Sequence, residues 1–227
     1  KMKLVILAGG KGTRLSEYTK KIPKPMVPIK KKPILCHIID HYRKYAVKDV
    51  IIATGYKHKI IQNYFKKNIY NDMNIRIVNT GLNTLTGLRV KKLQKFFLKG
   101  ENFYLTYGDG VSNVNINKLL KFHIKHKKIA TLTAVRPPAR FGEVEIKKSK
   151  IITFEEKPQL TRGWINGGFF VFNYKLFSFL NNKNSMLERG AIQKIINKKN
   201  FMAYQHNGFW MCMDTSRDKE LLEKIIK

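Results

Sequence analysis

The chain has 227 residues, 43% of them hydrophobic, which fits one compact α/β domain with a sizeable core rather than a disordered protein. No apolar run approaches the ~20 residues that span a bilayer, and two cysteines are too few for a disulfide framework, so we expect a cytoplasmic protein with no membrane partner. The net charge of +30 is spread along the chain, mostly as lysine, which favours a compositional bias over a nucleic-acid site.

Strand and helix patterns alternate along the first 136 residues. The apolar run at 3–8 is followed by glycines, as expected of a buried parallel strand, and residues 33–46 carry apolar side chains at helical spacing. The same patterns predict strands at 50–54, 75–78, 103–107 and 130–135, and helices at 58–66 and 115–126. Because such repeats form right-handed crossovers, the sequence predicts an α/β fold with a doubly wound, mostly parallel sheet.

The pattern changes after the two prolines at 137–138. A β-hairpin is predicted at 143–147 and 150–155, a buried strand at 167–172, and helices at 174–180, 187–198 and 216–226. No low-complexity linker separates this part from the rest. We therefore expect a single domain over 1–227, with one half at about 1–136 and a second half, in part antiparallel, at about 137–227.

A glycine-rich segment, Leu7-Ala8-Gly9-Gly10-Lys11-Gly12-Thr13-Arg14, follows the first predicted strand. Three glycines let the backbone approach a large anion, and exposed N–H groups with Lys11 and Arg14 would bind a triphosphate. The spacing matches neither the dinucleotide pattern G-x-G-x-x-G nor the P-loop pattern G-x-x-x-x-G-K-[ST]. A plain turn would not need the Thr-Arg pair, so we interpret the segment as a triphosphate-binding loop.

Three further charged residues are candidates for phosphate chemistry. Lys24 stands between two prolines, which restrict the backbone and hold its ammonium group in place. Asp109, flanked by Gly108 and Gly110, ends a predicted parallel strand, at the edge where ligands bind in open α/β sheets. Asp214 precedes the last predicted helix and is either a second carboxylate of the site or a helix cap. Two carboxylates, phosphate oxygens and water would together satisfy octahedral Mg²⁺.

These motifs together resemble the sugar nucleotidylyltransferases. Residues 80–89, 106–112, 164–170 and 208–219 narrow the resemblance to the glucose-1-phosphate cytidylyltransferases, and the match covers nearly the whole chain. It implies a Rossmann-like nucleotidyltransferase fold with a small antiparallel acceptor-binding subdomain, Mg²⁺ as cofactor, and CTP and a phosphorylated small molecule as substrates. The first half of the chain would then bind the nucleotide and the second half the acceptor.

The resemblance also assigns roles to residues. The residues implied to bind the nucleotide are Leu7, Ala8, Gly9, Gly10, Lys11, Gly12, Thr13, Arg14, Lys24, Thr84, Arg89 and Gly108. Those implied to bind the acceptor are Glu156, Lys157, Asn166 and Gly167. Asp109 and Asp214 would hold the metal, and Arg14, Lys24 and Asp109 would be catalytic. The expected reaction is attack of the acceptor phosphate on the α-phosphorus of CTP, which gives a CDP-activated product for surface polysaccharide synthesis and needs no general base.

Two departures from typical members of this family leave alternatives open. The stretch between Phe65 and Ile75 is shorter, so whether the chain forms a homo-oligomer stays open. The segment 187–191 replaces a Trp and a Glu-Pro on the expected acceptor side, which leaves room for another acceptor, such as L-glutamine phosphate in capsule phosphoramidate synthesis. The alternative from another class is a basic RNA-binding module, and the complete set of motif residues argues against it.

Overall fold

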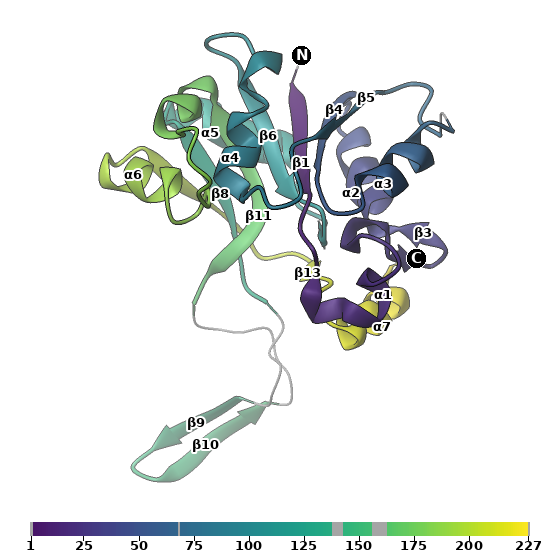
Figure 1. The fold of residues 1–227 in the computed structure, drawn as a ribbon. Coiled ribbons are helices and arrows are strands. Elements are labelled where there is room, and N and C mark those ends of the chain that lie inside the picture. Colours follow the sequence, from purple (N-terminus) through teal and green to yellow (C-terminus); the bar gives the residue numbers. More distant parts are fainter. Residues whose placement is uncertain (1, 68, 138–142, 156–162, 227) are drawn as a thin grey trace.

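The computed structural model describes residues 2–67, 69–137, 143–155 and 163–226. Its centre is a seven-stranded sheet in the order β12-β8-β11-β6-β1-β4-β5 (Figure 1). Within this sheet, β11 is antiparallel to both of its neighbours and the other pairs are parallel. The strands are β1 (Lys3–Ala8), β4 (Asp49–Thr54), β5 (Asn74–Asn79), β6 (Asn102–Tyr107), β8 (Ala130–Val135), β11 (Ile165–Asn173) and β12 (Phe201–His206).

Helices cover both faces of the sheet. Successive side chains of β1 point to opposite faces, so Leu4 and Ile6 belong to one hydrophobic cluster and Val5 and Leu7 to the other. The first cluster packs against α2 (Ile34–Arg43), α3 (His58–Phe65), α5 (Ile116–His126) and α7 (Ser216–Ile225). The second packs against α4 (Thr86–Lys91) and α6 (Ala191–Asn197). This arrangement confirms the predicted doubly wound, mostly parallel α/β fold.

Short elements complete the chain. The helix α1 (Ser16–Thr19) and four 3₁₀ helices (Thr13–Leu15, Lys24–Met26, Gln94–Phe96 and Tyr174–Phe179) occupy connections. Three two-stranded sheets are antiparallel: β2 (Pro28–Ile29) with β3 (Lys32–Pro33), β7 (Gly110–Ser112) with β13 (Trp210–Cys212), and β9 (Glu143–Lys147) with β10 (Lys150–Glu155). The β9–β10 hairpin has the bounds that the sequence predicted, and it lies apart from the main sheet in Figure 1.

The structure differs from the sequence-based expectations mainly in the second half of the chain, although in the first half the helix α4 was not predicted. The strand β12 was not predicted, although it forms the edge of the main sheet parallel to β8. The helix expected at 187–198 begins only at Ala191, and Tyr174–Phe179 is a 3₁₀ helix. Residues 187–190 instead form a loop that hydrogen-bonds to the start of α4, a long-range contact that helical periodicity does not report.

Candidate functional site

A cavity of about 590 Å³ opens at the carboxyl ends of β1 and β6. These two strands are neighbours in the sheet, and the chain leaves them toward opposite sides, so the cavity lies at the topological switch point where α/β proteins bind ligands. Its walls come from the glycine-rich loop, the 84–89 segment, the ends of β6 and β11, and β13. Predicted site residues that line it are Leu7, Ala8, Gly9, Gly10, Gly12, Arg14, Lys24, Thr84, Arg89, Gly108, Asp109, Asn166, Gly167 and Asp214.

Four predicted residues are not among those that line the cavity. Lys11 and Thr13 belong to the glycine-rich loop, but their side chains are exposed and the cavity is lined by their neighbours instead. Glu156 and Lys157 lie outside the described residues. Most residues predicted to bind the nucleotide therefore lie together around the cavity. Of the residues predicted to bind the acceptor, Asn166 and Gly167 line it.

Two glycines of the glycine-rich loop are required by close packing. Gly12 has a positive φ of 64°, and a Cβ atom there would lie 2.9 Å from Cβ of Lys24. A Cβ atom on Gly9 would overlap the guanidinium of Arg89. Both positions bring a cationic side chain against the backbone that is expected to face phosphates.

Arg89 is buried beneath this loop, with 3% of its surface exposed. Its guanidinium donates to the carbonyl oxygens of Thr54 (2.6 Å) and Thr84 (2.7 Å), and more weakly to those of Gly9 (3.4 Å) and Gly81 (3.3 Å). Burial lowers its pKa, because removal from water disfavours the charged form. Arg89 thus ties together the loops that follow β1, β4 and β5, a structural role that the sequence did not indicate.

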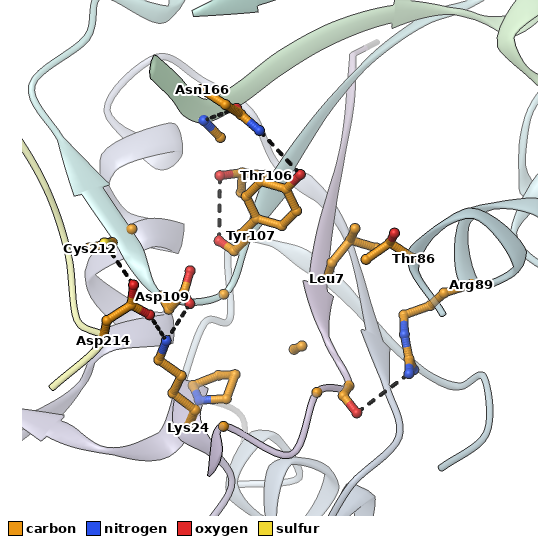
Figure 2. Close-up of a pocket in the computed structure, with 18 of the residues that line it drawn as sticks. Leu7, Lys24, Thr86, Arg89, Thr106, Tyr107, Asp109, Asn166, Cys212 and Asp214 are labelled. Carbon is orange, nitrogen blue, oxygen red and sulfur yellow. Dashed lines mark hydrogen bonds and ion pairs between the residues drawn. The ribbon is translucent and has the colours of Figure 1, made fainter. Parts of the chain in front are cut away.

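Three charged side chains, those of Lys24, Asp109 and Asp214, meet at the floor of the cavity (Figure 2), and Arg14 also lines the cavity. The ammonium group of Lys24 donates to Asp109 Oδ2 at 2.7 Å and to Asp214 Oδ1 at 2.6 Å. The guanidinium of Arg14, whose side chain is 71% exposed, lies 3.0 Å from Asp214 Oδ2. Two cations and two carboxylates therefore form a cluster with no net charge.

Burial and charge act against each other in this cluster. Burial lowers the pKa of Lys24, but the charge of Asp109 and the hydrogen bonds to both carboxylates outweigh it, so the pKa is raised. The pKa of Asp214 is lowered overall. Burial by itself would raise it, but the hydrogen bond and charge of Lys24, together with the charge of Arg14, outweigh that effect. Lys24 and Asp214 are both ionised near neutral pH as a result.

Local structure explains how these residues meet. The pairing of β13 with β7 places Cys212 opposite Gly110, and the N–H of Met213 donates to the carbonyl of Asp109 at 2.9 Å. Asp214 then follows β13 directly. The cap of α7 is Thr215, in a capping box with Asp218, so Asp214 is not the helix cap, and it lines the cavity instead.

The side chains at the floor of the cavity supply some, but not all, of the oxygen ligands that a hard divalent cation needs. Within the described ranges, no three His, Cys, Asp or Glu side chains gather into a metal-binding group. Asp109 and Asp214 nevertheless hold a cation between them, the Lys24 ammonium, and two carboxylates suit Mg²⁺ when phosphate oxygens and water fill its other positions. Cys212 lies 3.5 Å from Asp214, but burial, followed by the charges of Asp214 and Asp109, raises its pKa to about 12, so the thiol stays protonated.

The wall of the cavity across from the Lys24 cluster contains residues to which the sequence analysis assigned no role. Tyr107, Met186 and Trp210 line it beside the predicted residues Asn166 and Gly167. The indole N–H of Trp210 donates to the carbonyl of Gly167 at 2.7 Å, which joins β13 to β11. Tyr107 and Trp210 stand in two of the segments that carried the family resemblance, but a spacing pattern does not show which way a ring points.

A doubly wound sheet with a glycine loop, a pinned lysine and paired carboxylates at its switch point defines an enzyme that handles nucleoside phosphates. The chain belongs to the nucleotidyl transferase family, whose model matches residues 3–223. This assignment confirms the predicted family. No helix of the described residues has the length and apolar character to cross a membrane.

Curated relatives match along nearly their whole length. The glucose-1-phosphate cytidylyltransferase of Salmonella typhimurium is 41% identical over an alignment of 246 positions, which spans 99% of this chain and 95% of that protein. The D-glycero-α-D-manno-heptose 1-phosphate guanylyltransferase of Aneurinibacillus thermoaerophilus is 33% identical, with 92% and 89% covered. Among solved structures, HddC from Yersinia pseudotuberculosis, complexed with GMP-PN, matches with a TM-score of 0.78 over 100% of both chains and 22% identity. That likeness confirms the fold.

Proposed function

We propose that this enzyme transfers CMP from CTP to glucose 1-phosphate and releases pyrophosphate and CDP-glucose. The observation that carries the proposal is the cluster of Lys24, Asp109 and Asp214 against the glycine-rich loop, in a chain that is 41% identical to a glucose-1-phosphate cytidylyltransferase. The guanylyltransferase relative is less similar, at 33% identity, which favours CTP over GTP.

The proposed chemistry is an in-line displacement at phosphorus. An anionic oxygen of the acceptor phosphate forms a bond to the α-phosphorus of CTP, and the bond to the bridging oxygen of pyrophosphate breaks. No proton needs to be removed because the nucleophile is already charged. Catalysis then rests on positioning and on stabilisation of charge by groups fixed in advance.

The residues of the cavity divide this work between them. Backbone N–H groups of the glycine-rich loop would bind the triphosphate, and Arg14, being exposed, can turn from Asp214 to the phosphates. Lys24 would stabilise the charge that develops on the leaving pyrophosphate. Asp109 and Asp214 would hold Mg²⁺, which supplies neutralisation of phosphate charge when bound.

The wall opposite the glycine-rich loop would bind the sugar phosphate. Asn166 and Gly167 lie there, and we propose that Glu156 and Lys157, by family resemblance, add to it. The second half of the chain would thus supply most of the acceptor site, and its Asp214 would complete the metal site of the first half.

A coupled assay tests the function. The enzyme is mixed with CTP, Mg²⁺ and inorganic pyrophosphatase, and phosphate release is measured with glucose 1-phosphate, other sugar 1-phosphates and an amino-acid acyl phosphate. Release with glucose 1-phosphate supports the proposal, whereas release only with another acceptor would overturn the choice of glucose. Replacement of CTP by UTP, dTTP or GTP tests the base.

The role of Asp109 has its own test. Asp109→Asn should lower turnover by orders of magnitude while the protein stays folded, because the variant loses a charge aimed at the metal. Asp72→Asn is the matched control, since Asp72 pairs with Arg43 at an exposed site away from the cavity. Near-normal turnover of Asp109→Asn would refute a role in metal binding.

A further inference from the structure

The loop before α6 is attached to the start of α4 by hydrogen bonds along its length. Asn184 accepts from the N–H of Leu85 at 2.7 Å, and the carbonyl of Ser185 accepts from the N–H of Gly87 at 2.9 Å. The N–H of Leu187 donates to the hydroxyl oxygen of Thr86 at 2.8 Å. The loop therefore continues the nucleotide side of the cavity, because α4 also carries Arg89.

Glu188, in this loop, hydrogen-bonds to two residues that line the cavity, Thr86 and Tyr107. One carboxylate oxygen accepts a hydrogen bond from the hydroxyl of Thr86, with 2.7 Å between the oxygens. The other accepts a hydrogen bond from the hydroxyl of Tyr107 at 2.5 Å. An ionised carboxylate only accepts hydrogen bonds, so both hydroxyls must act as donors toward it. Thr86 belongs to α4 and Tyr107 ends β6, and Glu188 is thus a bridge between two elements that the chain separates by some distance.

The bridge fixes the position of the Tyr107 ring in the cavity wall. The ring packs on Gly168, which has a positive φ of 77°, and a Cβ atom there would lie 2.7 Å from Cδ2 of Tyr107. Burial, then the charge and hydrogen bond of Glu188, raise the pKa of Tyr107, so the phenol keeps its proton for the carboxylate. Ring and hydroxyl are therefore both held.

Asn166 completes the chain of hydrogen bonds on the acceptor side (Figure 2). Its side-chain oxygen accepts from the N–H of Gly168 at 2.8 Å, which assigns the amide orientation and leaves its NH₂ group toward Tyr107, 3.5 Å from the phenol oxygen. Because the Tyr107 hydroxyl donates its only hydrogen to Glu188, its oxygen can act toward Asn166 only as a hydrogen-bond acceptor. The second N–H of Asn166 is then available to an oxygen of a ligand.

We infer that Glu188 is a positioning residue of the acceptor site. Its carboxylate sets the direction of the hydrogen bonds from Asn166 through Tyr107 and holds the ring against which the sugar of a phosphorylated acceptor packs. The inference rests on the proposed function and deepens it, because it assigns a specificity role to a residue in the 187–191 segment. Glu188 does not itself line the cavity, so it would act through Tyr107, which does.

The test compares Glu188→Gln, Tyr107→Phe and the double variant. Glutamine has one acceptor oxygen where the hydroxyls of Thr86 and Tyr107 need two, so Glu188→Gln breaks the bridge, and Tyr107→Phe removes one of its donors. Loss of the bridge should raise the KM for glucose 1-phosphate by roughly threefold to tenfold, because one hydrogen bond is lost. The Kd of CTP, measured by calorimetry without acceptor, should stay within about twofold of wild type. The double variant should be no worse than either single variant, because the two changes remove the same interaction.

Controls separate positioning from general loss of structure. Glu101→Gln removes a carboxylate that pairs with Lys3 far from the cavity, and it should leave the KM for the acceptor unchanged. An unchanged KM in Glu188→Gln, additive effects in the double variant, or equal weakening of CTP and acceptor would overturn the inference. If Glu188→Gln fails to fold, Tyr107→Phe, which lacks a single oxygen atom, decides alone.

Failure of the proposed function is distinguishable from failure of this inference. Wild-type enzyme that releases phosphate with another sugar phosphate and none with glucose 1-phosphate would refute the function. The KM comparison is then made with the acceptor that turns over, and it bears on Glu188 as before.

Discussion

Replacement of Lys24 by methionine should let the paired carboxylates bind a divalent cation without nucleotide. In the structure the ammonium of Lys24 lies between Asp109 and Asp214, the two carboxylates that we propose would hold the metal. A metal must displace it, and with Arg14 also paired to Asp214 the cluster offers the incoming ion no net negative charge. The metal is therefore expected to bind wild-type enzyme together with the triphosphate, which brings the missing charge.

The magnitude follows from the two hydrogen bonds that the metal breaks, at 2.7 and 2.6 Å. Hydrogen bonds to charged groups contribute about 1.5–3 kcal/mol each, so displacement of the ammonium costs about 3–6 kcal/mol. Each 1.4 kcal/mol is about tenfold in affinity, so the Lys24→Met variant should bind the metal at least about a hundredfold more tightly than wild type. Methionine nearly fills the space of the lysine stem, which is 9% exposed as a residue.

Mn²⁺ serves as the probe because its free form is measured directly by electron paramagnetic resonance. Protein without CTP is titrated with Mn²⁺ at mildly alkaline pH. Lys21→Met is the matched control, since Lys21 is an exposed lysine three positions away, and it should bind Mn²⁺ as weakly as wild type. Affinity of Lys24→Met no higher than that of wild type would refute the reasoning, because the carboxylates would then not be a metal pair.

Two further predictions concern stability. Burial, and secondarily the charge of His126, lowers the pKa of His123 from 6.5 to about 4, and this side chain is 2% exposed. The folded state then binds fewer protons than the unfolded state between these values, so stability is complete above pH 6.5 and should fall by about 3 kcal/mol as the pH drops to about 4. Urea unfolding at several pH values should show a smaller fall in His123→Asn, which keeps a hydrogen-bonding side chain beside the Thr131 hydroxyl; parallel curves would contradict the assignment. Gly9→Ala should lower stability by about 1–3 kcal/mol without nucleotide, because the added methyl displaces the guanidinium of Arg89. Gly10→Ala, whose Cβ would meet no atom within 4 Å, should melt like wild type, and equal melting of both variants would show that the clamp is not needed.

Local patterns in the sequence determined the framework of this protein. Apolar runs and helical spacing predicted most of the longer strands and helices of the first half, because these patterns depend only on neighbouring residues, but they missed the helix α4. The glycine-rich segment predicted a close approach of the backbone to an anion, and in the structure this segment lines the cavity. The proline frame marked Lys24 among many other lysines for the same reason, since it restricts the local backbone.

Tertiary structure alone decided which residues share the cavity. Lys24 meets Asp109 and Asp214 across 85 and 190 positions, and Asp214 arrives there through the pairing of two three-residue strands that have no period to detect. Glu188 meets Tyr107 and Thr86 through a loop that the pattern had assigned to a helix. Arg89, expected at the nucleotide, is buried among carbonyl oxygens because three loops converge around it. Such contacts depend on how the elements pack, and a sequence pattern records only what one element requires of its own residues.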